Sequence, residues 1–199
     1  MPLTPVEPHM LATIVTSLEM LEKPRAKMLP AARLRLSRWK VPSLAAYRAL
    51  FRRVGEPWIW FSRLVMDDEE LAAIIHDPTV EIHAVQDQRG IEIGILELDF
   101  RKAGECEIGF FGFVPELTGK GHGGWLMAHA LSLGWRSGVE RMWVHTCTLD
   151  HPGALSFYRK QGFVPFARAI ETFADPRIAG LLSANAAPHV PLLQEASWR

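Results

Sequence analysis

Residues 114–125 read Val114-Pro-Glu-Leu-Thr-Gly119-Lys-Gly121-His-Gly123-Gly124-Trp125. The apolar residues before this segment predict a β-strand, and those after it predict a long helix that ends near Trp135. Because glycine has no Cβ atom, such a backbone can approach a ligand closely, and the first N–H groups of a helix point toward an anion placed there. The segment therefore predicts a phosphate-binding turn, with a pyrophosphate as its natural ligand.

This glycine turn has other interpretations. A helix start that binds nothing stays open, although four glycines in six residues are a costly way merely to begin a helix. Gly119, Gly121 and Gly124 also satisfy the G-x-G-x-x-G dinucleotide fingerprint, but this turn comes late and does not open a βαβ unit. A Walker loop is excluded, since Lys120 is followed by glycine where that motif needs Ser or Thr.

Upstream of the turn, the pattern predicts five strands and two helices. The strands are expected at residues 9–20, 32–40, 80–85, 91–100 and 107–114. The first two could pair with each other, and the last three form an antiparallel meander. Ser43 is a candidate N-cap for a helix through Arg53, and the acidic residues 67–70 open a second short helix.

Downstream of the turn, the elements alternate. After the long helix we expect a strand at residues 141–146, a helix at 153–161 and a last strand at 163–173. The Ala- and Pro-rich residues from 175 onward predict an irregular tail. This order predicts an α+β fold with a mixed, mostly antiparallel central sheet flanked by helices.

Composition narrows the function. The 22 basic and 22 acidic residues cancel, so no positive field draws the chain to nucleic acid or to an anionic membrane. No apolar run approaches the ~20 residues needed to cross a bilayer, and the first residues show no leader pattern, which predicts a cytoplasmic protein. Cys106 and Cys147 form no CxxC pair and the histidines form no HExxH motif, so we expect two buried thiols and no metal.

A second motif occupies residues 148–163, Thr148-Leu-Asp-His151-Pro-Gly-Ala154-Leu-Ser-Phe157-Tyr158-Arg-Lys-Gln-Gly162-Phe163. With the glycine turn, it resembles the GNAT superfamily of N-acetyltransferases, whose turn reads Q/R-x-x-G-x-G/A and whose later helix carries N-x-x-A-x-x-F-Y-x-x-x-G-F. The resemblance covers about residues 32–169. It implies a sheet splayed at an acetyl-CoA cleft, with an N-acetyltransferase domain at 31–174, a strand and connector at 1–30 and a tail at 175–199.

The resemblance also implies which residues hold coenzyme A: the backbone of the last strand residues for the pantetheine arm, and the turn for the pyrophosphate. They are Phe113, Val114, Thr118, Gly119, Lys120, Gly121, His122, Gly123, Gly124 and His151. Thr118 stands where the family has Gln or Arg, and His151, which could instead cap the following helix, stands where it has Asn. Gly109 and Gly112 inside the strand predict a bulge or a close approach, with tight packing against a helix as the alternative.

For catalysis, the resemblance implies that Tyr158 protonates the departing thiolate. A phenol with a pKa of about 10 suits that role, because it stays protonated at neutral pH; a core tyrosine is the alternative. Glu107 occupies the position of the glutamate base in the histone-acetylating branch; the alternatives are an ordered water as the base and Glu107 as a surface carboxylate. The family usually has two strands after the last helix where this chain has one, and the extra N-terminal strand could compensate.

Trp58, Trp60 and Arg63 lie in the region that forms the acceptor wall in the family. The indoles could line an amine site and Arg63 could meet a carboxylate, while core packing of both Trp residues stays open. The predicted function is transfer of an acetyl group from acetyl-CoA to a primary amine of an unidentified acceptor by direct attack. A non-catalytic coenzyme A-binding module is the alternative, a homodimer is left open, and a nicotinamide enzyme would need an acidic ribose ligand that residues 146–149 do not offer.

Overall fold

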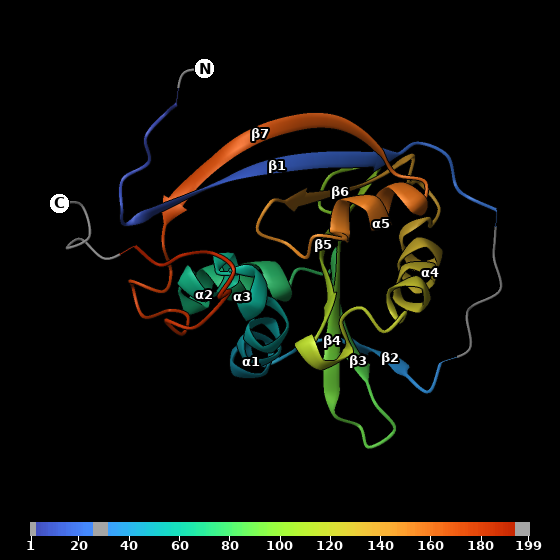
Figure 1. Ribbon diagram of the computed structural model, residues 1–199. Helices are drawn as coiled ribbons and strands as arrows, with labels where there is room; N and C mark the ends of the chain where they lie inside the picture. Colours follow the sequence, from blue (N-terminus) through green and yellow to red (C-terminus); the bar gives the residue numbers. More distant parts are fainter. Residues whose placement is uncertain (1–2, 26–31, 194–199) are drawn as a thin grey trace.

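The computed structural model describes residues 3–25 and 32–193. Seven strands form one sheet in the order β2-β3-β4-β5-β6-β1-β7 (Figure 1). Their bounds are β1 Met10–Met20, β2 Arg35–Trp39, β3 Val80–Gln86, β4 Glu92–Asp99, β5 Glu105–Phe113, β6 Arg141–Cys147 and β7 Val164–Ala174. All neighbouring strands pair antiparallel except β5 and β6, which are parallel. The predicted mixed, mostly antiparallel α+β fold is confirmed.

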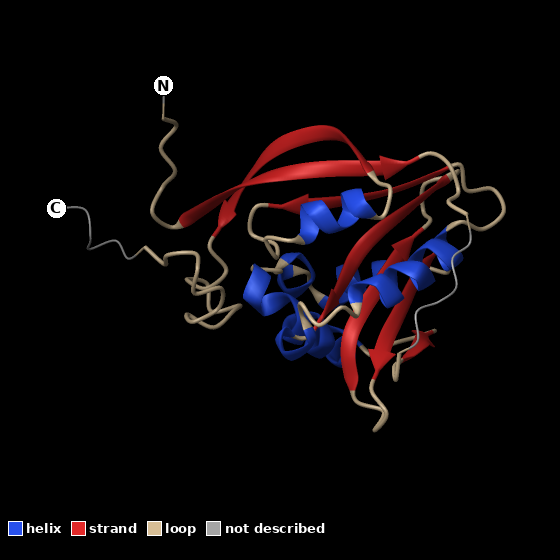
Figure 2. Ribbon diagram, turned by 45° about the vertical axis from the view of Figure 1, so that its right-hand side comes forward, coloured by secondary structure: helices blue, strands red, loops and turns tan. Residues whose placement is uncertain are grey.

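Helices cover both faces of the sheet (Figure 2). The helices are α1 Leu44–Gly55, α2 Ser62–Val65, α3 Asp68–Ile75, α4 Gly123–Gly134 and α5 Ala154–Lys160, with 3-10 turns η1 at Glu56–Trp58 and η2 at Pro115–Leu117. Helices α1 to α3 lie on one side of β4 and β5, and α4 lies on the other (Figure 1). None of the described helices is long and apolar enough to cross a bilayer.

The predicted helix starts are confirmed by their caps. The Ser43 hydroxyl accepts a hydrogen bond from the Ala46 N–H at 3.2 Å. Asp67 and Glu70 form a reciprocal capping box at α3, which places their carboxylates at the positive end of the helix dipole. Both caps connect residues only three positions apart, so they can be predicted from the sequence.

The predicted pairing of the two N-terminal strands is wrong. Strand β2 pairs with β3 at one end of the sheet, whereas β1 lies between β6 and β7 near the other end. The alternation of apolar residues identifies a strand but not its neighbours, and the two strands were close only in sequence. Strand β1 supplies β7 with a strand partner, which is consistent with the expectation that the N-terminal strand compensates.

The sheet opens between β5 and β6. They pair only over Glu105–Ile108 and Arg141–Val144, and beyond these residues they diverge. On the other edge of β5, Leu98 faces Ile108 and Glu97 faces Phe110, which leaves Gly109 as the extra residue of a β-bulge. A Cβ at Gly112 would lie 2.9 Å from a Val54 methyl of α1. Both interpretations therefore hold, the bulge at Gly109 and tight helix packing at Gly112.

The described part of the C-terminal tail, residues 175–193, forms no helix or strand. It is anchored by an ion pair between Arg177 and Asp175, whose side chains are 1% and 3% exposed. The Arg177 guanidinium also donates to the carbonyls of Ala186 and Val190. A buried charge needs such partners, so this pair fixes the path of the tail beside α1.

Candidate functional site

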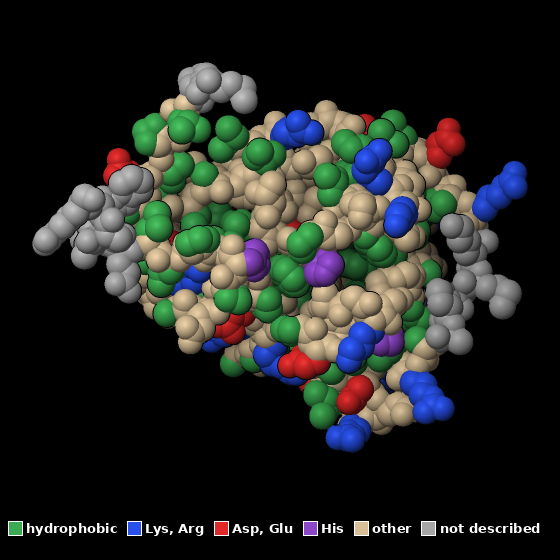
Figure 3. Space-filling view, in the orientation of Figure 1, with side chains coloured by type: hydrophobic (Ala, Val, Ile, Leu, Met, Phe, Trp, Pro, Cys, Tyr) green, Lys and Arg blue, Asp and Glu red, His purple; other side chains and the backbone are tan. Residues whose placement is uncertain are grey.

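A cavity of about 880 Å³ lies where β5 and β6 diverge. Its walls come from β5, the glycine turn, α5, the loop between α1 and α2, and the paired strands β1 and β7. On the face seen in Figure 3, histidine side chains lie among apolar ones near the centre. The cavity thus joins the glycine turn to the second motif, as the resemblance implies.

The glycine turn has the backbone of an anion site. Gly119 and Gly121 have φ values of 77° and 84°, which other residues rarely adopt. Helix α4 begins at Gly123, and its first bond in this turn runs from the Leu126 N–H to the His122 carbonyl at 3.2 Å. Among the described residues, nothing in the protein accepts from the N–H groups of residues 123–125. The turn therefore offers free donors beside the cavity.

The side chains of the turn behave differently from one another. The Thr118 hydroxyl donates to the Val114 carbonyl at 3.3 Å, so this shorter residue still braces the turn. The His122 ring lies 5.9 Å from the Phe113 ring and lines the cavity. Lys120 is exposed and is not part of the cavity lining.

Phe113 and Val114, the two residues expected to hold the pantetheine arm, differ in whether their backbone groups are free to bind a ligand. The Val114 N–H donates to Ile93 at 3.0 Å and its carbonyl accepts from the Leu117 N–H, so both groups are engaged within the protein. Successive N–H groups of a strand point to opposite edges, so the Phe113 N–H points away from β4 and toward the opening. Phe113 also lines the cavity, whereas Val114 does not.

Tyr158 lines the cavity from α5 with 7% of its surface exposed. Its ring packs against Phe111, Phe157 and Phe163. Within the described residues, its hydroxyl has no hydrogen-bond partner. Burial raises the pKa of Tyr158 well above its usual value, and the nearby Asp150 carboxylate adds to this, so the phenol is protonated at neutral pH.

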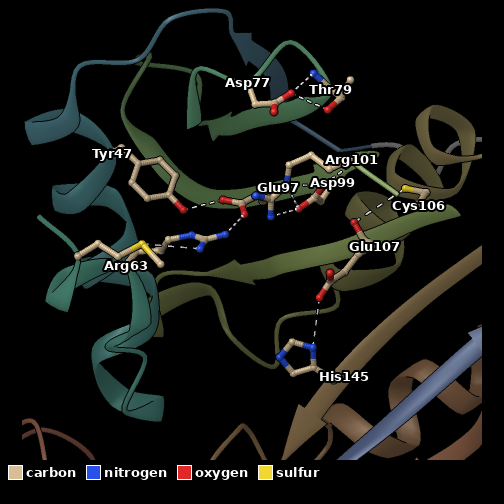
Figure 4. Close-up of polar contacts among 11 residues, drawn as sticks. Tyr47, Arg63, Asp77, Thr79, Glu97, Asp99, Arg101, Cys106, Glu107 and His145 are labelled. Atoms are coloured by element: carbon tan, nitrogen blue, oxygen red, sulfur yellow. Dashed lines mark hydrogen bonds and ion pairs between the residues drawn. The ribbon is translucent and has the colours of Figure 1, made fainter. Parts of the chain in front are cut away.

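Glu107 points from β5 toward His145 of β6, with 3.4 Å between its Oε1 and Nδ1 of the imidazole (Figure 4). Both side chains line the cavity. The ion pair with Glu107 raises the pKa of His145, and burial opposes this only in part. The sequence analysis did not identify His145; its place two residues from Trp143 on the same face of the strand was the available signal.

The predicted acceptor residues lie together on one wall. The Trp60 indole donates to Asp150 at 3.1 Å and packs against Phe51 and Phe110. The ring of Trp58 lies 5.2 Å from that of His151. Both indoles line the cavity, so Trp60 takes part in the core and in the wall. His151 Nδ1 accepts from the Gly153 N–H at 3.0 Å, but Gly153 is itself the N-cap residue of α5 and among the described residues this helix has no side-chain cap, so His151 does not cap it.

Arg63 already has a carboxylate partner in the protein. Its Nη2 donates to Glu97 at 2.6 Å, and the Tyr47 hydroxyl donates to the other oxygen of the same carboxylate at 2.6 Å (Figure 4). Glu97 is fully buried, so both partners compensate the removal of its charge from water. An acceptor carboxylate at Arg63 would have to share a guanidinium whose charge is already matched.

Asp150 is a further site residue that the sequence analysis missed. Its carboxylate accepts from the Thr146 hydroxyl at 2.7 Å, the Cys147 N–H at 2.8 Å and the Trp60 indole at 3.1 Å. It thereby ties the end of β6 to Trp60 on the cavity wall. The turn Thr148-Leu-Asp150 after a strand was the signal, since Asp commonly bonds backbone groups in such turns.

An open sheet with a glycine turn at a helix start and a cavity between parallel strands is the arrangement of acetyltransferase folds. The model of the acetyltransferase (GNAT) family matches residues 34–163. This match covers more than half of the 199 residues, and the chain belongs to that family. No curated protein matches the chain in sequence.

Solved structures show the same fold. A GCN5-related N-acetyltransferase from Sphaerobacter thermophilus is 17% identical over 82% of this chain and 51% of the other, with a TM-score of 0.55. A second, from Kribbella flavida, is 17% identical over 86% and 63%, with a TM-score of 0.53. An aminoglycoside acetyltransferase from an uncultured soil metagenomic sample is 18% identical over 65% and 88%, with a TM-score of 0.52. The chain thus spans half to two thirds of the first two proteins.

Proposed function

We propose that the protein transfers an acetyl group from acetyl-CoA to a primary amine by direct attack. The observation that carries this proposal is a single cavity lined by the free backbone of the glycine turn at one end and by Tyr158 and Glu107 further along. The turn would hold the pyrophosphate, and the Phe113 backbone would pair with the pantetheine arm. The thioester would then lie at the opening beyond Ile108 and Val144.

The transfer requires three events: attack of the amine, loss of a proton from its nitrogen and protonation of the departing thiolate. A neutral amine attacks the thioester carbonyl, and backbone N–H groups of β5 beyond the bulge at Gly109 would polarise that carbonyl. The amine nitrogen loses a proton to a base on the acceptor side, where Glu107 lies. As the C–S bond breaks, the thiolate takes the proton of Tyr158, whose hydroxyl is free of protein partners.

The charge of the cavity indicates the kind of amine. The carboxylates that line it are Glu97, Asp99, Glu107, Asp150 and Glu171, and the cationic side chains are Arg63 and Arg101. Arg63 is paired with Glu97 and Arg101 with Asp99. The remaining carboxylates attract a cation, so we propose an acceptor that carries no carboxylate beside its amine.

A non-catalytic coenzyme A-binding module is the competing function. The two are separated by measuring thiol release from acetyl-CoA with a panel of mono- and polyamines and amino acids, alongside calorimetric titration with coenzyme A. We expect coenzyme A to bind and thiol release to depend on the amine. Binding without release for any amine would favour the module, and the absence of binding would refute the site.

A further inference from the structure

His145 stands at the place where the sheet opens. It is the first residue of β6 beyond the last pair, Ile108 with Val144, just as Gly109 is the first beyond it on β5. Its ring faces the cavity, and 49% of its side chain is exposed there. The imidazole is therefore accessible from the cavity.

The two ring nitrogens of His145 have different surroundings. Nδ1 faces the Glu107 carboxylate at 3.4 Å (Figure 4), an arrangement that favours the tautomer with the proton on Nδ1. Within the described residues, Nε2 has no hydrogen-bond partner. In this tautomer its lone pair is free for a proton.

The charges around the ring come from three elements. Glu107 lies on β5, Asp150 in the loop after β6 and Glu171 on β7, and all three act on the imidazole. They favour its protonated form, so the ring can hold a proton taken from an amine. They also attract a cationic acceptor toward the same place.

We infer that His145 is the base that takes the acceptor proton, and that Glu107 is the positioning residue that holds its ring. The inference rests on the proposed function and replaces Glu107 as the group that meets the amine. The C–N bond forms at the thioester carbonyl, one amine proton passes to Nε2 of His145, and the C–S bond breaks with the thiolate taking the proton of Tyr158. The products are the amide and free coenzyme A, and the proton held by His145 returns through solvent to the Tyr158 oxygen, so that both groups are restored without another reactant.

The test is the pH dependence of kcat and kcat/KM in the wild type and in three variants. His145→Gln is expected to lower kcat about 10²–10⁴-fold and to remove the acid limb of the profile, because the base must be neutral to act. Glu107→Gln is expected to keep an acid limb but shift it to lower pH, since the pKa of His145 falls without its partner. His9→Gln makes the same chemical change at an exposed residue outside the cavity and is expected to leave the profile unchanged.

A second readout does not depend on turnover. The imidazole resonances of His145, assigned by their loss in His145→Gln, are titrated by NMR in the wild type and in Glu107→Gln, with coenzyme A affinity as a check on folding. A pKa that stays the same in Glu107→Gln would refute the positioning role. A His145→Gln enzyme that keeps the wild-type rate and acid limb would refute the role of His145 as the base but not the proposed function. A wild-type protein that acetylates no amine would overturn both.

Discussion

The chain contains two tyrosines, Tyr47 and Tyr158, and their hydroxyl groups have different surroundings. Both rings are buried, with 0% and 7% of the surface exposed. The Tyr47 hydroxyl donates to the buried Glu97 carboxylate at 2.6 Å, whereas that of Tyr158 has no partner within the described residues. Replacing each tyrosine by Phe removes one oxygen. We expect a loss of catalytic rate at Tyr158 and a loss of stability at Tyr47.

Tyr158→Phe keeps the ring and leaves no buried polar group without its hydrogen-bond partner. The free energy of unfolding is therefore expected to change by less than about 0.5 kcal/mol. Only the proposed proton donor is lost. Removal of a general acid typically costs about 10²–10⁴ in rate, so kcat is expected to fall within that range while coenzyme A affinity stays near the wild-type value.

Tyr47→Phe is the matched control. It leaves one oxygen of a fully buried carboxylate without its donor, which costs about 1–3 kcal/mol of stability. The melting temperature is then expected to fall by roughly 2–4 °C for each kcal/mol, while the acid at Tyr158 is kept.

The assay is single-turnover acetylation followed by thiol release, with thermal unfolding measured in parallel. The loss in Tyr158→Phe is expected to shrink with a less basic thiol as leaving group, because a weaker base needs less protonation. Wild-type rates for Tyr158→Phe when chemistry limits turnover would refute the role of the hydroxyl and the mechanism built on it.

Three further predictions concern binding, folding and pH. Gly121→Val is expected to weaken coenzyme A binding at least about fivefold, corresponding to about 1 kcal/mol, because valine opposes the positive φ and its side chain fills the anion site. The control is Gly90→Val, at a φ of 81° in the β3–β4 turn. It carries the same backbone strain and should lower stability without changing the affinity measured by calorimetry. Deletion of residues 3–21 is expected to abolish cooperative unfolding, since it removes the strand between β6 and β7, and a truncated protein that still melts cooperatively would contradict this. Burial lowers the pKa of His83, so between that pKa and about 6.5 the unfolded chain binds more protons than the folded one; stability should fall as the pH drops through this window, and His83→Gln should flatten the dependence in denaturant titrations.

Local signals in the sequence predicted most of the elements. Caps at Ser43 and Asp67 and the glycines after Val114 each act within a few residues, and the strands and helices that they delimit lie within a few residues of the expected positions. The partners of β1 could not be predicted in this way, because a strand pattern carries no information on which distant strand it meets.

The residues of the candidate site likewise fall into those that local sequence predicted and those that it did not. The cavity is lined by the glycine turn and Tyr158, which belong to motifs contiguous in sequence, and by Glu107, which starts the strand that leads to the turn. The pairs that give the site its charge, Glu107 with His145 and Arg63 with Glu97, connect residues more than thirty positions apart. Only the register of the sheet and the path of α2 bring them together, and neither can be predicted from the spacing of residues.

The position of β1 also constrains how the chain folds during synthesis. This strand is synthesised before both of its neighbours, β6 and β7, which lie between residues 141 and 174. Until those residues emerge, its two edges have no partner, and the cavity wall lacks Thr13 and Val15 in their final place. Pairing over such a long sequence separation is slow, and the eleven-residue strand β1 has no partner before residues 141–174 have been synthesised. The cavity is complete only once β1 has paired with β6 and β7.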